Sequence, residues 1–415
     1  MPAPLPPTDT AGATSSASAP RYHGLDWLRA IAAVAVIGLH AGIAYTVVPF
    51  PGLAWPVHDA RPSPAVDALT WWIDAWIMPV FFMMGGLLAA QLFRRLGPAD
   101  FLKHRTRRLL VPFAFACVAI LPLDLYAWLL GWVVEERIPL KKLRSLKLGD
   151  AGANLWGVGH LWFLEYLFVF CVGAVVVRWL MGAARGGRLR LPAKPLSAVR
   201  FPLWPLPLCS ALALWADPQL VIGFRHAWHP LPANLLYYAP CFAAGWWMLQ
   251  RRPDDRRATL LAAAGLLASP LVFAAALPLI HAYAATGLDG SQRVLLAVLF
   301  TACGWTAALG ALRLSLLPIA APPPRAVHYV SQASFWLYLF HHPAVGLAQV
   351  ALHGSGMPAV VKFLLVWLCA LALSLLTYAA FVHRTWIGTL LNGRQKPGAS
   401  SRESPEQTPH VRRAA

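Results

Sequence analysis

The chain has 415 residues, of which 58% are hydrophobic and only 13% are charged. Apolar stretches long enough to cross a bilayer recur from one end to the other. They exclude a soluble globular protein and predict an all-α integral membrane protein. The Lys and Arg residues that give the chain its formal net charge of +18 cluster in alternating loops. Because this is the positive-inside pattern of membrane proteins, nucleic-acid binding is not needed to explain the basic composition.

About ten transmembrane helices fit the apolar stretches. An even number places both termini on the same side, and the basic loops at 94–107, 182–201 and 251–257 indicate that this side is the cytoplasm. Prolines in the fifth expected helix can break it or shift its ends, so the sequence does not fix where this helix begins and ends. The sequence therefore predicts a multi-pass protein of the bacterial inner membrane. The expected helices cover about 25–48, 65–93, 108–134, 159–181, 202–222, 231–250, 258–284, 293–317, 329–351 and 359–383.

Composition divides the chain into three segments. Residues 1–20 are rich in Pro, Ala, Ser and Thr, and residues 392–415 are polar and basic, so both tails are predicted to be disordered. Residues 21–391 are expected to form one helical membrane domain. The six cysteines lie in apolar stretches without a C-x-x-C pair, so neither a disulfide nor a bound metal is expected.

The first predicted helix carries two ionisable residues on one face. Arg29 and His40 lie eleven residues apart, which is about 20° past three full turns. The separation along the axis is about 16 Å, half the thickness of a bilayer core. Asp26 precedes Arg29 by one turn and can orient it. A histidine at this depth either hydrogen-bonds a neighbouring helix or belongs to a functional path, and we predict the latter for His40.

A basic turn follows the second predicted helix. Arg105 and Arg108 lie three residues apart and can face one ligand. Because guanidinium groups bind phosphates through paired hydrogen bonds, both are candidate contacts for a cytosolic phosphate-bearing ligand. The alternative is that this turn only anchors the chain on the cytoplasmic side.

Further candidate site residues lie in three other helices. The segment Gly159–Glu165 (GHLWFLE) carries His160 and Trp162, and its Glu165 needs a partner or water inside the membrane. His160 and Glu165 do not face each other, because five residues turn a helix by about 140°. Asp74 is expected to line an outer cavity, whereas Asp124 lies beside Pro122, where freed backbone groups offer it partners.

Two adjacent histidines lie in the ninth predicted helix. His341 falls near the middle of the membrane, as His40 does, so the two are expected to converge on one cavity. Histidine is well suited to take a proton from a hydroxyl near neutral pH. His342 points about 100° away and is interpreted as a packing residue.

These residues resemble those of acyltransferase family 3, a family of membrane-bound O-acyltransferases. Arg29 and His40 match the family's Arg, ten residues, His pattern, and Arg105 and Arg108 match its RxxR motif. The HLWFL and YLFHHP segments are also similar. The resemblance spans residues 22–385 and is strongest to the glucan biosynthesis protein C subgroup, the periplasmic glucan succinyltransferases. The chain departs from the family in having Gly-Gly, where Ser-Gly is frequent, after the Phe-Phe of the second helix.

The resemblance implies an enzyme that transfers acyl groups other than amino-acyl groups. Acyl-CoA would be the donor, succinyl-CoA first and acetyl-CoA next, with its phosphates near Arg105 and Arg108 and its thioester reaching past Arg29. The acceptor would be a hydroxyl of a periplasmic or exported glycan, such as osmoregulated periplasmic glucan. The lipid bilayer and other glucan-synthesis proteins are the expected partners. The oligomeric state is left open.

The resemblance also suggests roles within the site. His40 would be the base or would carry the acyl group transiently, and both alternatives fit acyl transfer. His341 would orient His40 or the acceptor, and Glu165 would pair with either histidine. His160, Trp162 and Asp74 are candidate contacts to the substrate.

A proton-coupled secondary transporter of a small polar solute is the alternative from another class. It would also place His, Arg and Glu inside the membrane, as a proton relay. Transporters of this kind are built from inverted repeats with paired broken helices, and the sequence shows no convincing pair.

Overall fold

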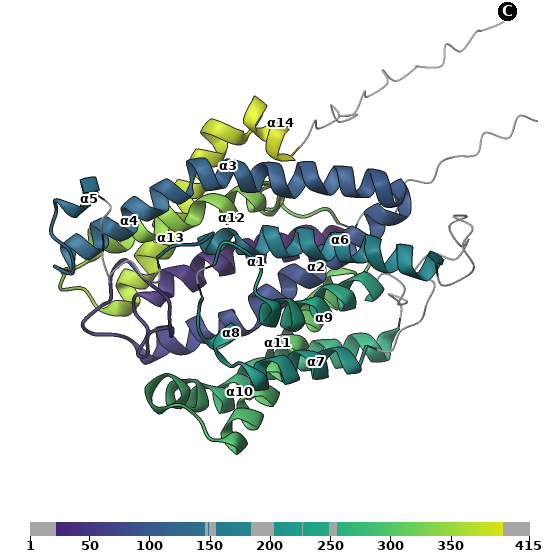
Figure 1. Cartoon of the computed structure of the whole chain (residues 1–415), viewed down its shortest axis with the longest axis horizontal. Helices are drawn as coiled ribbons and strands as arrows, with labels where there is room; N and C mark the ends of the chain where they lie inside the picture. Colours follow the sequence, from purple (N-terminus) through teal and green to yellow (C-terminus); the bar gives the residue numbers. More distant parts are fainter. Residues whose placement is uncertain are drawn as a thin grey trace, which may run out of the picture.

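The structure is a computed structural model that describes residues 22–145, 148, 155–183, 203–225, 227–248, 255–319 and 321–392. Both predicted tails lie outside these residues, apart from the last residue described, and so does most of the expected basic loop at 182–201. Throughout the described residues the chain is helical and forms no strand. Most of the helices run side by side, with α14 at one edge and α10 at the opposite edge (Figure 1).

The helices follow one another with few long connections. In chain order they are α1 (His23–Ile43), α2 (Pro64–Arg105), the π-helical η1 (Thr106–Leu110), α3 (Val111–Ala119), α4 (Leu121–Val134), α5 (Lys142–Ser145), the 3-10 helix η3 (Gly159–Leu161), α6 (Trp162–Ala183), α7 (Pro205–Ala216), α8 (Gln219–Ile222), α9 (Pro232–Met248), α10 (Arg256–Thr286), α11 (Gly290–Ser315), α12 (Arg325–Leu352), α13 (Ala359–Thr377), the π-helical η5 (Tyr378–Val382) and α14 (Trp386–Asn392).

Prolines and one glycine explain where these helices differ from the predicted ones. The stretch expected as one helix at 108–134 is divided between α3 and α4, and Pro122 lies in the first turn of α4. The fifth expected helix, whose ends the sequence did not fix, is divided into α7 and α8, with Pro218 preceding α8. The second helix continues beyond its predicted end, with a kink at Gly97, whose φ of 75° lies in the left-handed region that glycine tolerates.

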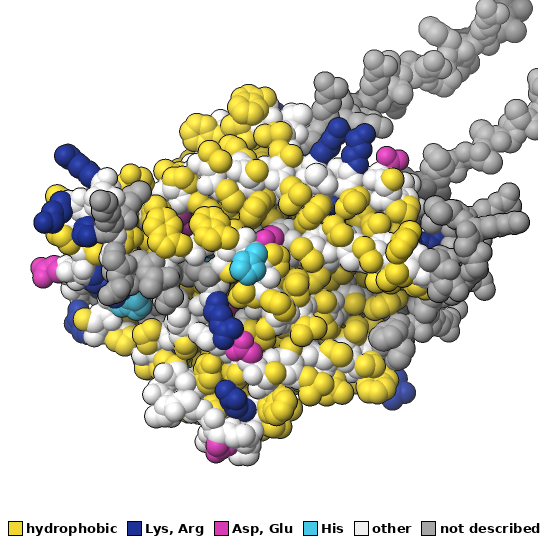
Figure 2. Space-filling model, in the orientation of Figure 1, with side chains coloured by type: hydrophobic (Ala, Val, Ile, Leu, Met, Phe, Trp, Pro, Cys, Tyr) yellow, Lys and Arg dark blue, Asp and Glu magenta, His cyan; other side chains and the backbone are white. Residues whose placement is uncertain are grey.

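Six helical stretches among the described residues are long and apolar enough to cross a membrane. Among the described residues one further helix, α7, is apolar but shorter than a span, with 12 residues. Hydrophobic side chains dominate the middle of the face shown in Figure 2, as a lipid-facing surface requires. A multi-pass membrane protein is thus supported, while ten spans and cytoplasmic termini stay predictions. The six stretches are His23–Ile43, Pro64–Val134, Gly159–Met181, Arg256–Thr286, Gly290–Ser315 and Ala359–Val382.

The first helix is the centre of the bundle. α1 packs against α2, α11, α12 and α13, and its small residues permit close contact. A Cβ atom built on Gly42 would lie 2.0 Å from Oγ1 of Thr70 in α2, and one on Gly38 would lie 2.9 Å from the Trp367 ring of α13. This packing fixes the C-terminal half of α1, which carries His40, between α2 and α13.

A second close contact joins α2 to α9. A Cβ atom on Gly86 would lie 2.0 Å from the carbonyl oxygen of Phe242, and one on Gly245 would lie 1.8 Å from that of Met83. Each helix therefore presents a glycine to the backbone of the other, and no larger residue fits at either position.

Candidate active site

A cavity of about 500 Å³ opens beside the C-terminal half of α1. Its walls come from α1, the first half of α2, the end of α3, the start of α4, η3, the first turns of α6 and α9, the middle of α12 and the segments around residues 50–55 and 219–231. Polar groups are few on these walls, as is usual for a small-molecule site. The aromatic residues on the walls are Phe50, Trp55, Tyr126, Trp128, Trp156, Trp162, Tyr166, Phe224, Trp228, Tyr238 and Tyr338.

His40 and His341 meet at the wall of this cavity. Nδ1 of each ring lies 2.8 Å from a backbone carbonyl oxygen one turn earlier, that of Val36 for His40 and that of Leu337 for His341. Because a carbonyl oxygen only accepts, we assign the proton of each neutral ring to Nδ1. Nδ1–H of His40 then also donates to Nε2 of His341, at 3.2 Å. Nε2 of His40 is left unprotonated, as a base or nucleophile requires.

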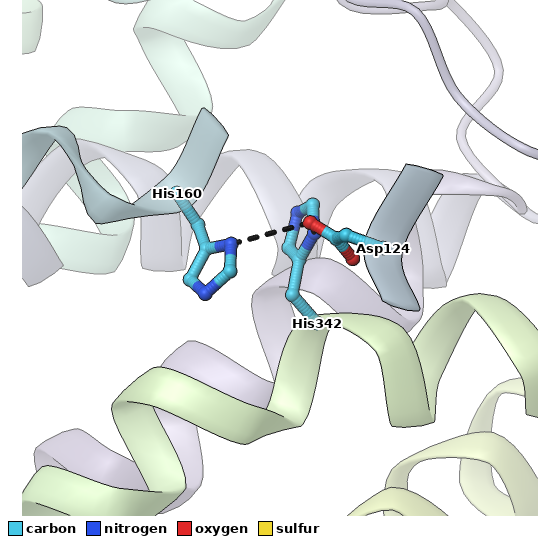
Figure 3. A group of neighbouring side chains, drawn as sticks. All are labelled: Asp124, His160 and His342. Carbon is cyan, nitrogen blue, oxygen red and sulfur yellow. Dashed lines mark hydrogen bonds and ion pairs between the residues drawn. The ribbon is translucent and has the colours of Figure 1, made fainter. Parts of the chain in front are cut away.

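A second polar group lies next to this pair and consists of Asp124, His160 and His342. The three side chains point toward one another from α4, η3 and α12 (Figure 3). Nδ1 of His342 donates to Oδ2 of Asp124 at 2.7 Å, and Nδ1 of His160 lies 3.4 Å from the same oxygen. Nε2 of His160 donates to the carbonyl oxygen of Leu339 at 3.0 Å.

Two interpretations of the sequence are therefore wrong. His342 is not a mere packing residue. The cavity extends past one face of α12, so residues 100° apart on this helix both reach it. Asp124 does not depend on backbone groups freed by Pro122, because a proline in the first turn of a helix removes no hydrogen bond that the helix would make. The side-chain partners of Asp124 come from α12 and η3 instead.

Two aromatic neighbours fix the ring of His342. Its plane is stacked on Trp128, with ring centroids 4.6 Å apart and an interplanar angle of 14°. On the other side it is stacked on His160, at 4.5 Å and 21°. The ring of His40 meets it edge-on, with centroids 4.9 Å apart.

Asp124, His160 and His342 lie close enough together to hold a metal ion, since their ligand atoms are within 4.8 Å of one another. A metal ligand lies in the plane of each imidazole ring that binds it. Two nearly parallel stacked rings do not direct their in-plane lone pairs at one point. The arrangement therefore favours a hydrogen-bonded network over a metal centre.

Arg29 lies on α1 at a distance from His40 of about half the thickness of a bilayer core, and it is not part of the cavity walls. Its Nη2 donates to Oγ of Ser334 in α12 at 3.1 Å. Asp26 also contacts α12, because Oγ of Ser331 donates to its carboxylate at 3.2 Å. Serines of α12 thus supply contacts to both charged residues at this end of α1.

The expected phosphate-binding arginines lie at the junction of α2 and η1, also outside the cavity walls. The guanidinium carbon of Arg105 is 5.5 Å from the centre of the Phe101 ring, and its buried Nε has no hydrogen-bond partner among the described residues. Nη1 of Arg108 donates to the carbonyl oxygen of Leu391 in α14 at 2.9 Å. Arg108 is thus already engaged with the last helix, whereas Arg105 retains a free donor.

Glu165, Trp162 and Asp74 all line the cavity. Among the described residues Glu165 forms no hydrogen bond or ion pair with His40 or His341, so the expected pairing is not found. One buried oxygen of Asp74 and one of Glu165 have no hydrogen-bond partner among the described residues.

Sequence reasoning missed the residues that hold the end of α1. Nε2 of Gln349 donates to the carbonyl oxygens of His40 and Ala41 at 3.1 Å each, and Oε1 of Gln349 accepts from Nε1 of Trp55 at 2.8 Å. A signal was present, because Gln349 is a polar residue seven positions after His342 and thus on the same face of α12. Nothing in the local sequence marks Trp55 as its partner.

Comparison with known proteins gives a consistent result. A family model described as an acyltransferase domain matches residues 22–382. Curated proteins named "Glucans biosynthesis protein C" are similar as well. The protein from Salmonella paratyphi B is 28% identical over 191 residues, 46% of this chain and 47% of that protein. The one from Salmonella typhi is 30% identical over 156 residues, 37% and 38% of the two chains. These matches span less than half of the relatives' length, and no solved structure matches the chain.

Proposed function

Because the chain belongs to this acyltransferase family, whose model covers residues 22–382, we propose that it transfers an acyl group to a hydroxyl of a glycan. The acyl group is succinyl first and acetyl next, and the donor is cytosolic acyl-CoA. The acceptor is a periplasmic or exported glycan, in line with the names of the relatives. The enzyme resides in the bacterial inner membrane.

The observation that carries this proposal is the pair of His40 and His341. Backbone carbonyls hold both rings with Nδ1 protonated, which leaves Nε2 of His40 free at the cavity wall. A neutral imidazole in this state can accept a proton from a hydroxyl or attack a thioester carbonyl. His341 keeps His40 in place through their 3.2 Å contact.

The donor approaches from the end of α1 that carries Arg29. The phosphates of coenzyme A bind near Arg105, whose Nε is free of hydrogen-bond partners among the described residues, with Arg108 close by. The pantetheine chain then spans the half-membrane from Arg29 to His40, about 16 Å along the helix. The thioester thus reaches the cavity without the coenzyme crossing the membrane.

The acceptor enters the cavity from the opposite side. Aromatic side chains such as Trp156, Trp162 and Trp228 offer flat apolar surfaces for the faces of sugar rings. Glu165 and Asp74 supply hydrogen-bond acceptors for sugar hydroxyls. A mixture of aromatic surfaces and a few polar groups suits a neutral glycan.

Mass spectrometry of periplasmic glucans tests the proposal. Cells that lack the gene receive the wild type, His40→Ala or His353→Ala, the last as a control at the end of α12 outside the cavity. Succinyl groups on the glucans should return with the wild type and the control but not with His40→Ala. Acetyl groups would change the donor and keep the mechanism. If His40→Ala, made in normal amounts, restores the groups fully, the role of His40 is refuted. Uptake of a polar solute without acyl donor would instead favour a transporter.

A further inference from the structure

His40 and His342 each bring to the cavity an imidazole nitrogen that is free to accept a proton. Nδ1–H of His40 donates to a carbonyl oxygen, and Nδ1–H of His342 donates to Asp124, so Nε2 of both rings is unprotonated. Within the described residues neither Nε2 has a hydrogen-bond partner, and neither is sealed from the cavity. The ring centroids are 4.9 Å apart, so both nitrogens can act on the same bound group.

The surroundings of the two rings differ in charge. A proton taken up by His342 creates an imidazolium whose Nδ1–H already lies 2.7 Å from the carboxylate of Asp124. A proton taken up by His40 creates an imidazolium whose Nδ1–H faces a carbonyl oxygen and the neutral His341, and among the described residues no carboxylate forms an ion pair with it. In a site of low dielectric constant, a carboxylate in direct contact stabilises the cation far more than neutral groups do.

The remaining groups around His342 leave this asymmetry intact. His160 donates its Nε2–H to the Leu339 carbonyl, and its Nδ1 lies 3.4 Å from the carboxylate oxygen that His342 contacts at 2.7 Å, so His342 forms the shorter of the two contacts to Asp124. Trp128 stacks on the opposite face of the His342 ring and is uncharged. Stacking on both faces holds the ring plane, which keeps Nε2 directed at the cavity.

We propose that His342, oriented by Asp124, is the base that deprotonates the acceptor hydroxyl, while His40 contacts the acyl group. This inference rests on the proposed function. The O–H bond of the acceptor breaks as its proton passes to Nε2 of His342. The oxygen forms a bond to the acyl carbon, and the C–S bond to coenzyme A breaks. The proton on His342 then neutralises the released thiolate, which restores the resting ring.

The experiment compares purified variants in lipid nanodiscs with succinyl-CoA and a short glucan. His342→Gln and Asp124→Asn should lower kcat about 100-fold or more, since general bases contribute about 10²–10⁴-fold, while binding of labelled succinyl-CoA is unchanged. Asp67→Asn is the matched control, because Asp67 forms a similar buried contact, 2.8 Å from Nε2 of His281, away from the cavity. It should retain wild-type kcat.

Chemical rescue separates the base from a structural role. Added imidazole should restore a measurable part of the kcat of His342→Gly and none of that of His40→Gly. Three outcomes overturn the inference: wild-type kcat in His342→Gln, rescue of His40→Gly instead, or activity lost to a chelator and recovered with zinc. In each, transfer by the wild type still supports the proposed function. If the wild type transfers no acyl group at all, both proposals fall.

Discussion

Breaking one buried ion pair should loosen the outer wall of the cavity. Nζ of Lys362 in α13 lies 2.6 Å from Oδ2 of Asp59, and the two side chains are only 5% and 8% exposed. Asp59 belongs to the segment between α1 and α2, which also supplies Trp55 to the cavity. In Asp59→Asn the ammonium stays buried without its counter-charge, at an expected cost of about 3–5 kcal/mol in stability.

A double-mutant cycle measures how much of this loss of stability comes from the interaction between the two charges. Lys362→Met alone leaves Asp59 uncompensated and should also destabilise, whereas the double variant removes both charges and should recover most of the loss. Thermal unfolding of each variant in one detergent, with acyl transfer as a second readout, measures the coupling. The single variants should melt several degrees below the double variant. Additive losses, with no recovery in the double variant, would refute the reasoning.

The same pair sets a pH dependence. Burial alone would raise the pKa of the Asp59 carboxyl, but the hydrogen bonds from Lys362 and from the Arg61 backbone N–H outweigh it and hold this pKa below its ordinary value. A carboxyl of this kind stabilises the fold above its unfolded pKa of about 3.9 and loses the effect as the pH falls through the lower folded value. The difference between wild type and Asp59→Asn should therefore persist from neutral pH down to about 4 and shrink below it.

Three other changes have defined outcomes. Gln349→Leu removes both hydrogen bonds to the end of α1 and leaves Nε1 of Trp55 without its acceptor. Acyl transfer should therefore slow while binding of acyl-CoA is retained. Slower binding with normal turnover would contradict this. Arg105→Gln should raise KM for acyl-CoA about tenfold or more at near-normal kcat, since a hydrogen bond to a charged group contributes about 1.5–3 kcal/mol; an unchanged KM would remove Arg105 from the donor site. Gly245→Ala places a Cβ 1.8 Å from the Met83 carbonyl and should lower the yield of folded protein on size-exclusion chromatography; an unchanged yield and Tm would show that α9 can shift.

Local patterns were enough to predict the helices that carry the site. The eleven-residue spacing places Arg29 and His40 on one helix, and α1 does contain both. The depth argument for His341 needed only the length of its helix, and the two rings do meet. Helix ends were predicted less well where prolines divide a long apolar stretch, because an apolar pattern continues across such a break.

Contacts between distant segments could not be predicted in the same way. Asp124 and His342 are 218 positions apart, and Trp55 and Gln349 are 294 apart. No periodicity connects such pairs, because they depend on how α4 and the segment between α1 and α2 pack on α12. The apolar surroundings of Asp124 signalled that it needed a partner, but only the assembled bundle shows that the partner is a histidine at the cavity.

The reciprocal glycines of α2 and α9 limit how the protein can move. Since Gly86 sits beneath the Phe242 carbonyl and Gly245 beneath that of Met83, a slide of one turn would drive larger residues into these positions. The two helices are therefore expected to move together as one rigid unit. This unit contributes Asp74 and Tyr238 to the cavity wall. The stretch between α1 and α2 is also held, because Trp55 donates to Gln349 of α12 and accepts at its carbonyl from Trp132 of α4, so room for a bulky sugar chain has to come from the other walls of the cavity.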